Sequence, residues 1–303
     1  MGKRRILVGY GIDVDACSSP INTRDGAKPD LTNISRGTFG ATVGVPRLLD
    51  LWKKKTIKCS WYIPGHTLET FPEEMALIRD AGHEIGLHGY THEYPGDLTR
   101  EQFEATLVKT IDITTRFCGM KPKGFTAPAW KTSPDMVDVL EQHGIEYGLS
   151  LTSRVAADHS FMHHDFKPYY VPYGRECFQA TDYKNHPETW MVPMKQSAKS
   201  NVVEIPGNWS IDDWPPFQFD PWSVSQGYVD PFNIERQWQE QFQWCYENYD
   251  TFIFPISIHP QVSGRPHILR MHERFIDWVN REHEGVEWCT FATMAQEFRE
   301  GRI

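Results

Sequence analysis

Apolar residues recur along this chain in two periods, one typical of strands and one typical of helices. The apolar run at 6–8 predicts a first strand, and further strand-like runs lie at 57–62, 83–87, 145–151, 202–205, 251–258 and 286–291. Apolar positions three or four residues apart predict helices between them, at 46–52, 70–82, 99–119, 133–144, 234–249 and 268–281. This alternation predicts an α/β barrel of parallel strands with its active groups on the loops at the strands' carboxyl ends.

Several helix ends are marked by capping signals. Thr70 with Glu73, and Thr99 with Gln102, fit the capping-box pattern at a helix N-terminus. Glycines at 82, 119 and 144 are expected to stop the helices that precede them. Periodicity is lost from about 152 to 200, where we expect a long loop excursion over one face of a single domain that spans 1–303.

Composition narrows the class of protein. The 303 residues are 40% hydrophobic and 23% charged, which is typical of a soluble globular chain with a sizeable core. The net charge of -9 argues against nucleic-acid binding, and no apolar run approaches membrane-spanning length. The N-terminal apolar run is too short for a signal-peptide core, and the six dispersed cysteines contain no CxxC pair, so we expect a cytoplasmic protein with free thiols.

The most informative chemical pattern is His88-Gly89-Tyr90-Thr91-His92. Two imidazoles four residues apart also arise by chance as surface or core histidines, but Gly89 disfavours a helix, so His88 is expected where a strand gives way to a loop. Asp13 and Asp15 lie at the end of the first predicted strand, where they either cap a loop or supply carboxylates. Two histidines and one carboxylate can hold a catalytic divalent metal while leaving open positions, and such an ion would acidify water and polarise a carbonyl.

Other polar and aromatic residues fall at predicted strand ends. His259 follows the buried run 251–258, where it is either a general acid or a hydrogen-bonded structural histidine. Trp130, Trp209 and Trp214 either form pocket walls or pack in the core. Arg265 either reaches a substrate oxygen or is a solvated loop arginine. We expect these last four residues to contact substrate.

Taken in order, four segments resemble the motifs of the polysaccharide deacetylase (NodB-homology) family. They are Gly11 to Asp15, Gly82 to His92, Gly124 to Trp130, and Ser257 to Pro260. The resemblance covers nearly the whole chain and implies a deformed (β/α) barrel. It further implies that Asp13 is the catalytic base, that Asp15, His88 and His92 hold the metal, and that His259 is the general acid.

The chain departs from the usual sugar deacetylases in two places. Val14 separates the two aspartates, which those enzymes have side by side, and Thr126 stands where they carry an arginine that orients the base. The pattern is closer to an atypical branch that includes peptidoglycan-deacetylase-like proteins, cyclic-imide hydrolases and allantoinase-like enzymes, whose members are often homo-oligomers. We therefore expect a homo-oligomer.

The resulting hypothesis is hydrolysis of a non-peptide amide C–N bond with one divalent ion, zinc first and cobalt, manganese or iron as alternatives. A small cyclic imide, ureide or similar amide is the preferred substrate, because no export signal directs the chain to a cell wall. The alternatives are N-deacetylation of peptidoglycan-type or chitin-type sugars and, in another class, a catalytically degenerate metal-binding or ligand-binding module.

Overall fold

The computed structural model describes residues 4–149, 164–172, 181–193, 199–219 and 227–303. Within these ranges one sheet runs through the molecule in the order β6-β7-β5-β4-β3-β2-β1-β8, and β9 pairs with β1 outside this path. The strands are β1 (Arg5–Asp13), β2 (Ser60–Ile63), β3 (Glu84–Leu87), β4 (Gly124–Thr126), β5 (Tyr147–Leu149), β6 (Tyr169–Pro172), β7 (Lys199–Glu204), β8 (Thr251–Ile258) and β9 (Val286–Trp288).

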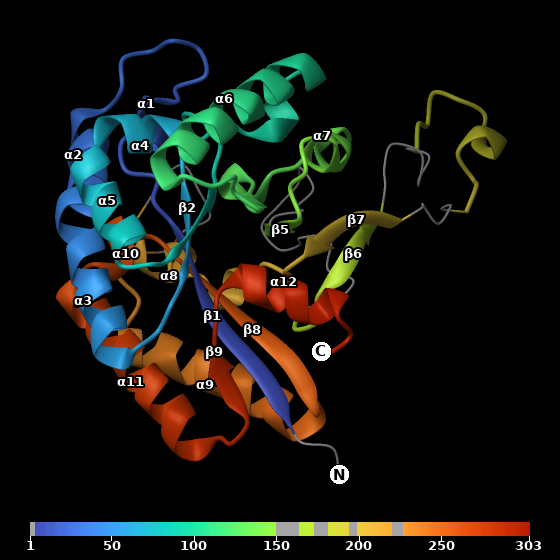
Figure 1. Ribbon diagram of the computed structural model, residues 1–303. Helices are drawn as coiled ribbons and strands as arrows, with labels where there is room; N and C mark the ends of the chain where they lie inside the picture. Colours follow the sequence, from blue (N-terminus) through green and yellow to red (C-terminus); the bar gives the residue numbers. More distant parts are fainter. Residues whose placement is uncertain (1–3, 150–163, 173–180, 194–198, 220–226) are drawn as a thin grey trace.

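All of these pairings are parallel except that of β6 with β7. The expected α/β class with a parallel sheet is therefore confirmed. The antiparallel pair lies at the edge of the molecule far from α2 and α3 (Figure 1). β6 falls within 152–200, the stretch expected to be a loop excursion, so that expectation is wrong at 169–172; the rest of the stretch lies partly outside the described residues.

The sheet curls into a barrel that is not completed by a strand ladder. Between the β7 side and β8, the described residues form one isolated parallel bridge, which pairs Asp212 with Ser257 of β8. The Asp213 amide donates to the Ser257 carbonyl at 3.2 Å, and the Ile253 amide donates to the Phe166 carbonyl at 2.9 Å. We call this weakly bonded junction between the β7 and β8 sides the seam.

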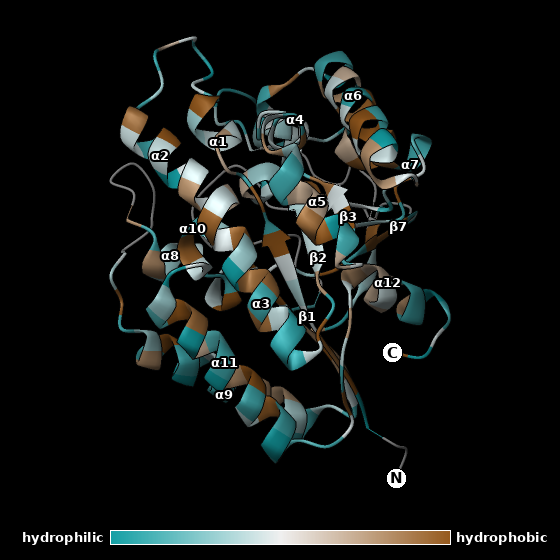
Figure 2. Cartoon of the chain, turned by 60° about the vertical axis from the view of Figure 1, so that its left-hand side comes forward, coloured by the Kyte–Doolittle hydropathy of each residue, from teal (hydrophilic) through white to brown (hydrophobic). Residues whose placement is uncertain are grey.

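Helices cover the outside of the barrel (Figure 1). They are α1 (Ser18–Ile21), α2 (Leu31–Phe39), α3 (Val45–Lys55), α4 (Gly65–Thr70), α5 (Pro72–Asp80), α6 (Arg100–Cys118), α7 (Met136–Gln142), α8 (Trp214–Phe217), α9 (Pro231–Asn248), α10 (Pro260–Ser263), α11 (Pro266–Glu282) and α12 (Phe291–Arg299). A π-helical stretch, Gly40–Gly44, joins α2 to α3. The outer helices carry both hydrophilic and hydrophobic residues, as helices with one buried face do (Figure 2). Among the described residues no helix is long and apolar enough to cross a membrane.

Successive side chains of β1 point to opposite faces of the sheet and so contribute to two different parts of the core. Ile6, Val8 and Tyr10 face the outer helices, whereas Leu7 faces the barrel interior with Phe291. Gly11 lies on that interior side, where an added Cβ would come within 2.6 Å of the Phe291 ring. The absence of a side chain at Gly11 thus lets the start of α12 close the interior.

The capping signals were right at one helix and wrong at another. Thr99 and Gln102 form the expected capping box at the start of α6, and Gly119 ends that helix in a left-handed conformation. Thr70, by contrast, is the last residue of α4, and its hydroxyl donates to the His66 carbonyl. The helix α5 instead begins at Pro72 after a break at Phe71, because proline supplies a preset first helical turn.

Replacing Thr99 with Ala is expected to lower the free energy of unfolding by about 1 kcal/mol, because the N3 amide loses its side-chain acceptor. Urea unfolding followed by circular dichroism measures this change. Thr106→Ala is the matched control, since Thr106 lies inside the same helix and bonds only the Gln102 carbonyl of the preceding turn. Equal stability of the two variants would contradict the capping role.

Candidate functional site

The residues singled out by the sequence converge at the carboxyl ends of four strands. Asp13 ends β1, Thr126 ends β4, His88 follows β3, and His259 follows β8. The carboxyl ends of parallel strands meet at one edge of a sheet, so residues far apart along the chain become neighbours there. The expectation that His88 sits at a strand-to-loop transition is confirmed.

Asp15, His88 and His92 form a compact buried group. The Oδ1 atom of Asp15 lies 3.3 Å from Nε2 of His88 and 3.6 Å from Nε2 of His92. All three residues are buried, and each offers one ligand atom within 4.8 Å of the others. These separations suit a divalent ion, because bonds of about 2.0–2.1 Å in a tetrahedron place neighbouring ligand atoms about 3.3 Å apart.

The polar atoms of this group support the same interpretation. Oδ1 of Asp15 and Nε2 of His88 are buried and lack a hydrogen-bond partner among the described residues. Buried polar atoms without partners are costly, and a bound cation would satisfy both. The structure therefore brings together the three residues expected to hold a metal, and the donor set fits one divalent ion.

The local backbone aims the two histidines at Asp15. The Nδ1 of His88 donates to the Thr126 carbonyl at 2.7 Å, which leaves Nε2 facing the carboxylate. Gly89 and His92 both adopt positive φ, and Asn22 donates to the His92 carbonyl at 2.9 Å. A non-glycine residue at φ 61° is uncommon, and such strained positions cluster at functional sites.

Asp13 lies beside this group without belonging to it. Its Oδ2 is 3.8 Å from Nε2 of His88 and 4.0 Å from Nε2 of His259. Burial raises the pKa of the Asp13 carboxyl, and the nearby imidazoles of His88 and His259 offset part of that rise. Among the described residues no arginine or lysine forms an ion pair with Asp13, in keeping with Thr126 at the position where the sequence resemblance places an arginine in other members.

At Asp15 and His92 the balance between burial and neighbouring charges differs from that at Asp13, whereas at His88 the carboxylates of Asp13 and Asp15 outweigh burial and raise the pKa of the imidazole. Burial would raise the pKa of Asp15, but the imidazoles of His92 and His88 more than offset it and bring the pKa well below its ordinary value. Burial lowers the pKa of His92 to about 4. A carboxylate that stays ionised and an imidazole that stays neutral are the protonation states that metal ligation requires.

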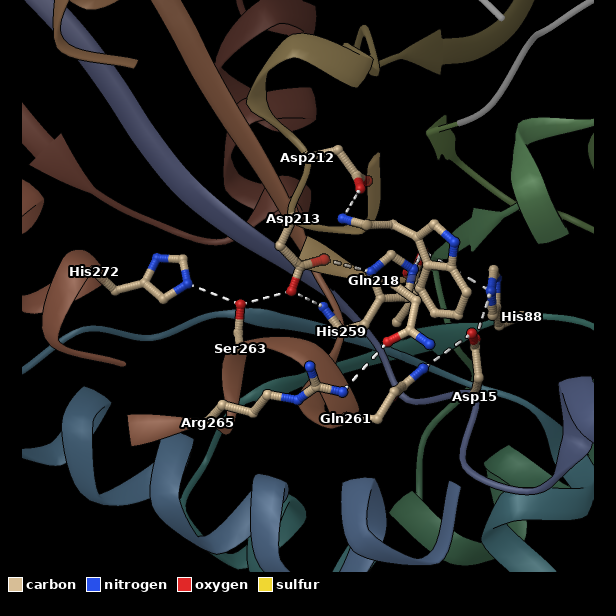
Figure 3. A network of polar contacts seen from close by, with 12 residues as sticks. Asp15, His88, Asp212, Asp213, Gln218, His259, Gln261, Ser263, Arg265 and His272 are labelled. Carbon is tan, nitrogen blue, oxygen red and sulfur yellow. Dashed lines mark hydrogen bonds and ion pairs between the residues drawn. The ribbon is translucent and has the colours of Figure 1, made fainter. Parts of the chain in front are cut away.

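His259 is held by a residue that the sequence analysis missed. Its Nδ1 lies 2.7 Å from Oδ1 of Asp213, and its backbone amide donates to Oδ2 of Asp213 at 2.9 Å (Figure 3). Burial alone would lower the pKa of His259, but the carboxylate of Asp213 and then that of Asp212 raise it well above its ordinary value. In the sequence, the two adjacent aspartates Asp212 and Asp213 beside Trp214 were the signal from which this contact could have been suspected.

Asp212, Asp213 and His259 also come close enough to hold a metal ion. Here, however, the potential ligand atoms already have hydrogen-bond partners, since Nδ1 of His259 donates to Asp213 and Oδ1 of Asp212 accepts from the Trp214 amide at 2.6 Å. The group of Asp15, His88 and His92 is thus the better metal centre.

The four residues expected to bind substrate lie in different surroundings. Trp214 packs edge-on against His259, with ring centroids 4.9 Å apart. Trp130 is buried and packs on Trp209, with ring centroids 4.3 Å apart. Arg265 is partly buried, and its guanidinium lies 3.5 Å from Oε1 of Gln218 (Figure 3). Within the described part of the chain, Trp214 is the member of this set whose ring packs on His259, and contact of the four residues with substrate stays a prediction.

The network around Asp213 extends to His272 in α11. Ser263 donates to Oδ2 of Asp213 at 2.6 Å, and its hydroxyl lies 2.8 Å from Nε2 of His272. Burial lowers the pKa of His272 to about 4. A histidine exposed in the unfolded chain titrates near 6.5, so the unfolded state binds the proton first as the pH falls.

His272 is therefore expected to stabilise the fold fully above pH 6.5 and to lose that contribution between pH 6.5 and pH 4. At pH 5 the loss relative to pH 7.5 amounts to about 2 kcal/mol. Urea unfolding of the wild type and of His272→Gln at the two pH values measures it. Glutamine does not titrate, so the variant should show a pH dependence smaller by this amount, and identical pH dependence would exclude a neutral His272.

The chain is similar to known proteins over almost its whole length. Residues 37–148 match the family described as "Polysaccharide deacetylase". The chain is 42% identical over 297 residues to a peptidoglycan deacetylase of Helicobacter pylori, covering 97% of each chain. It is 35% identical to the peptidoglycan deacetylase-like protein FGM2 of Gibberella zeae, covering 98% of this chain and 87% of that one.

A solved structure shares the fold across nearly the whole chain. The Puue allantoinase superposes with a TM-score of 0.75 at 20% identity, covering 99% of this chain and 92% of that one. At this identity the likeness concerns the fold, and it confirms the expected deformed barrel in a single domain. The expected family resemblance is likewise confirmed by the full-length sequence similarity.

Proposed function

We propose that this chain, which belongs to the polysaccharide deacetylase family, removes acetyl groups from N-acetylated sugars of the peptidoglycan type. The single observation that carries the proposal is the arrangement around Asp15, where three metal-ligand side chains meet and a second carboxylate and a third imidazole flank them. Family membership establishes a hydrolase of C–N bonds. The substrate is the part that we propose.

The metal would be held by Asp15, His88 and His92. When bound, a divalent ion supplies Lewis acidity that favours hydroxide over water and polarises the acetyl carbonyl. Zinc remains our proposal among the ions that such ligands accept, which include cobalt, manganese and iron.

Asp13 and His259 would carry the proton transfers. Asp13 is assigned as the base that takes a proton from the attacking water, because it is the carboxylate left outside the ligand group. His259 is assigned as the acid that protonates the departing nitrogen through Nε2, because Nδ1 is engaged by Asp213. Oδ2 of Asp13 and Nε2 of His259 lie 4.0 Å apart, so both groups could exchange protons with a scissile amide and its attacking water held beside them.

The relatives favour the N-acetyl sugar over the small cyclic amide that the sequence analysis preferred. That preference depended on the expected cytoplasmic location, which stays a prediction, as does the expected homo-oligomer. The peptidoglycan deacetylase of Helicobacter pylori matches this chain over almost its full length, whereas the allantoinase shares the fold only. The presence of a buried base and a buried acid beside the metal group also disfavours a pure binding module.

The test is turnover by the zinc-loaded protein, with acetate release measured on peptidoglycan fragments and chitooligosaccharides. Ring opening of cyclic imides and allantoin is measured in parallel. We expect acetate release from the glycans and little ring opening. Turnover of the rings alone would favour the small-amide hypothesis, and full metal occupancy without any turnover would favour a binding module.

A further inference from the structure

The side chains behind His259 form a buried hydrogen-bonded row that the proposed chemistry does not use. The row runs from Asp213 through Ser263 to His272 and then to Tyr10, which belongs to β1 (Figure 3 shows the part from Asp213 to His272). Ser263, His272 and Tyr10 are each fully buried. Burying polar groups this deeply costs stability unless each has a hydrogen-bond partner. Each contact in the row therefore needs one donor and one acceptor, and these can be assigned in turn.

The direction of every bond in the row follows from one proton. A serine hydroxyl has a single hydrogen, and the Asp213 carboxylate can only accept, so Ser263 donates to Oδ2 of Asp213 over 2.6 Å. Ser263 must then accept at its other contact, which makes Nε2 of His272 the donor over 2.8 Å. In neutral His272 the Nδ1 atom is then left as an acceptor facing the Tyr10 hydroxyl at 3.4 Å.

This pattern constrains Asp213. Its Oδ2 receives two hydrogen bonds, one from Ser263 and one from the His259 amide, and its Oδ1 faces Nδ1 of His259. Rotation of the carboxylate would break at least one of these bonds. With Oδ2 occupied by two donors, Oδ1 is the atom that faces the ring, and Nδ1 of His259 is the donor in this pair.

We propose that Ser263 and His272 are positioning residues, which fix the Asp213 carboxylate so that His259 keeps its Nδ1 proton and presents Nε2 to the reacting amide. This inference rests on the proposed function, in which His259 is the general acid. Neither residue contacts the metal ligands, and both act through Asp213.

The surroundings of His272 agree with a role in orientation. Its ring lies among aromatic side chains, at centroid distances of 5.5 Å from Tyr10, 5.7 Å from Trp238 and 6.4 Å from Trp52. A phenylalanine would fill such an environment without the cost of burying two ring nitrogens. The imidazole is explained by its bond to Ser263.

Ser263→Ala is the first test, made in the full-length zinc-loaded protein. We expect kcat for acetate release from a chitooligosaccharide to fall by about tenfold or more, since hydrogen bonds to charged groups have effects of this size, while KM and zinc content stay near wild type. Ser257→Ala is the matched control, because Ser257 in β8 is likewise buried and its hydroxyl lacks a partner among the described residues.

His272 supplies a second pair of variants. His272→Phe removes the donor to Ser263, whereas His272→Gln can place an amide nitrogen near the position of Nε2. We expect His272→Phe to lower kcat and His272→Gln to restore part of it. Equal kcat in the two variants, or a wild-type kcat in Ser263→Ala, would overturn the proposal.

A readout without substrate separates this inference from the proposed function. Nitrogen NMR of the zinc-loaded protein reports which nitrogen of His259 carries the proton and how firmly. We expect a protected Nδ1–H signal in the wild type and in Ser257→Ala, and an exchange-broadened or shifted signal in Ser263→Ala. If the wild type turns over no glycan, this signal still decides the inference, and an unchanged signal in Ser263→Ala refutes it.

Discussion

Replacing Asp13 with Asn is expected to lower kcat by about a thousandfold while leaving one metal ion per chain. Asparagine keeps the shape of the side chain but cannot accept a proton, and general-base catalysis contributes roughly 10²–10⁴ in rate. The metal should remain because Asp15, His88 and His92 form the ligand group without Asp13. Steady-state kinetics and elemental analysis of the same sample measure the two effects.

The same substitution is expected to leave the unfolding free energy of the metal-free protein equal or higher at neutral pH. Burial raises the pKa of Asp13, which means that the ionised carboxylate is disfavoured in the folded state. Asp25→Asn, at an exposed loop carboxylate, controls for the chemical change itself. An Asp13→Asn enzyme with nearly normal kcat would exclude this residue as the base, and loss of the metal would make it a ligand.

His88→Ala is expected to abolish turnover by removing the metal. His88 supplies the buried Nε2 atom that lacks another partner and faces Asp15 at 3.3 Å, so its loss leaves two ligands. Metal affinity should fall by at least about a hundredfold, because two ligands hold zinc far less tightly than three. Elemental analysis after dialysis, together with the melting temperature with and without added zinc, measures the loss.

The thermal measurement gives an independent check on His88. A ligand that binds only the folded state raises stability, so zinc should raise the melting temperature of the wild type and have little effect on His88→Ala. His143→Ala, which removes a partly exposed histidine paired with Glu104, should respond to zinc like the wild type. A full zinc response in His88→Ala would place the metal elsewhere.

The parts of the fold that the sequence predicted are those governed by local patterns. The strand 251–258 and the helix that begins after Thr99 have strong periodicity or capping chemistry, and both were placed correctly. The strand at 57–62 was placed about three residues too early, because the apolar run begins before the pairing of β2 with β1 at Ser60. The antiparallel strand β6 was missed, since its partner β7 lies 30 residues later in an irregular stretch.

For the site as well, residues within local sequence patterns could be predicted, whereas residues defined by long-range contacts could not. Asp13, Asp15, His88, His92 and His259 could be singled out because each lies at or shortly after the end of a strand, within a short motif, and their roles stay predictions. Asp213 was overlooked because its role depends on a partner 46 residues away, and local periodicity says nothing about such contacts. Ser263 and His272 became interpretable only when the structure placed Ser263 between Asp213 and His272. The five cysteines that the structure describes are free thiols, as predicted, and Cys177 lies outside the described residues.

The seam has a consequence for how enzymes of this architecture can diversify. The residues proposed to hold the metal follow β1 and β3, which belong to the continuous ladder, whereas Asp213 and Trp214 lie on the other side of the seam. A single bridge imposes little register on the chain that crosses it, so that chain can lengthen, shorten or change sequence without disturbing the ladder. Selection for a new substrate could therefore act on the seam side around Trp214 while the metal group stays unaltered, as long as Asp213 keeps its bonds to His259.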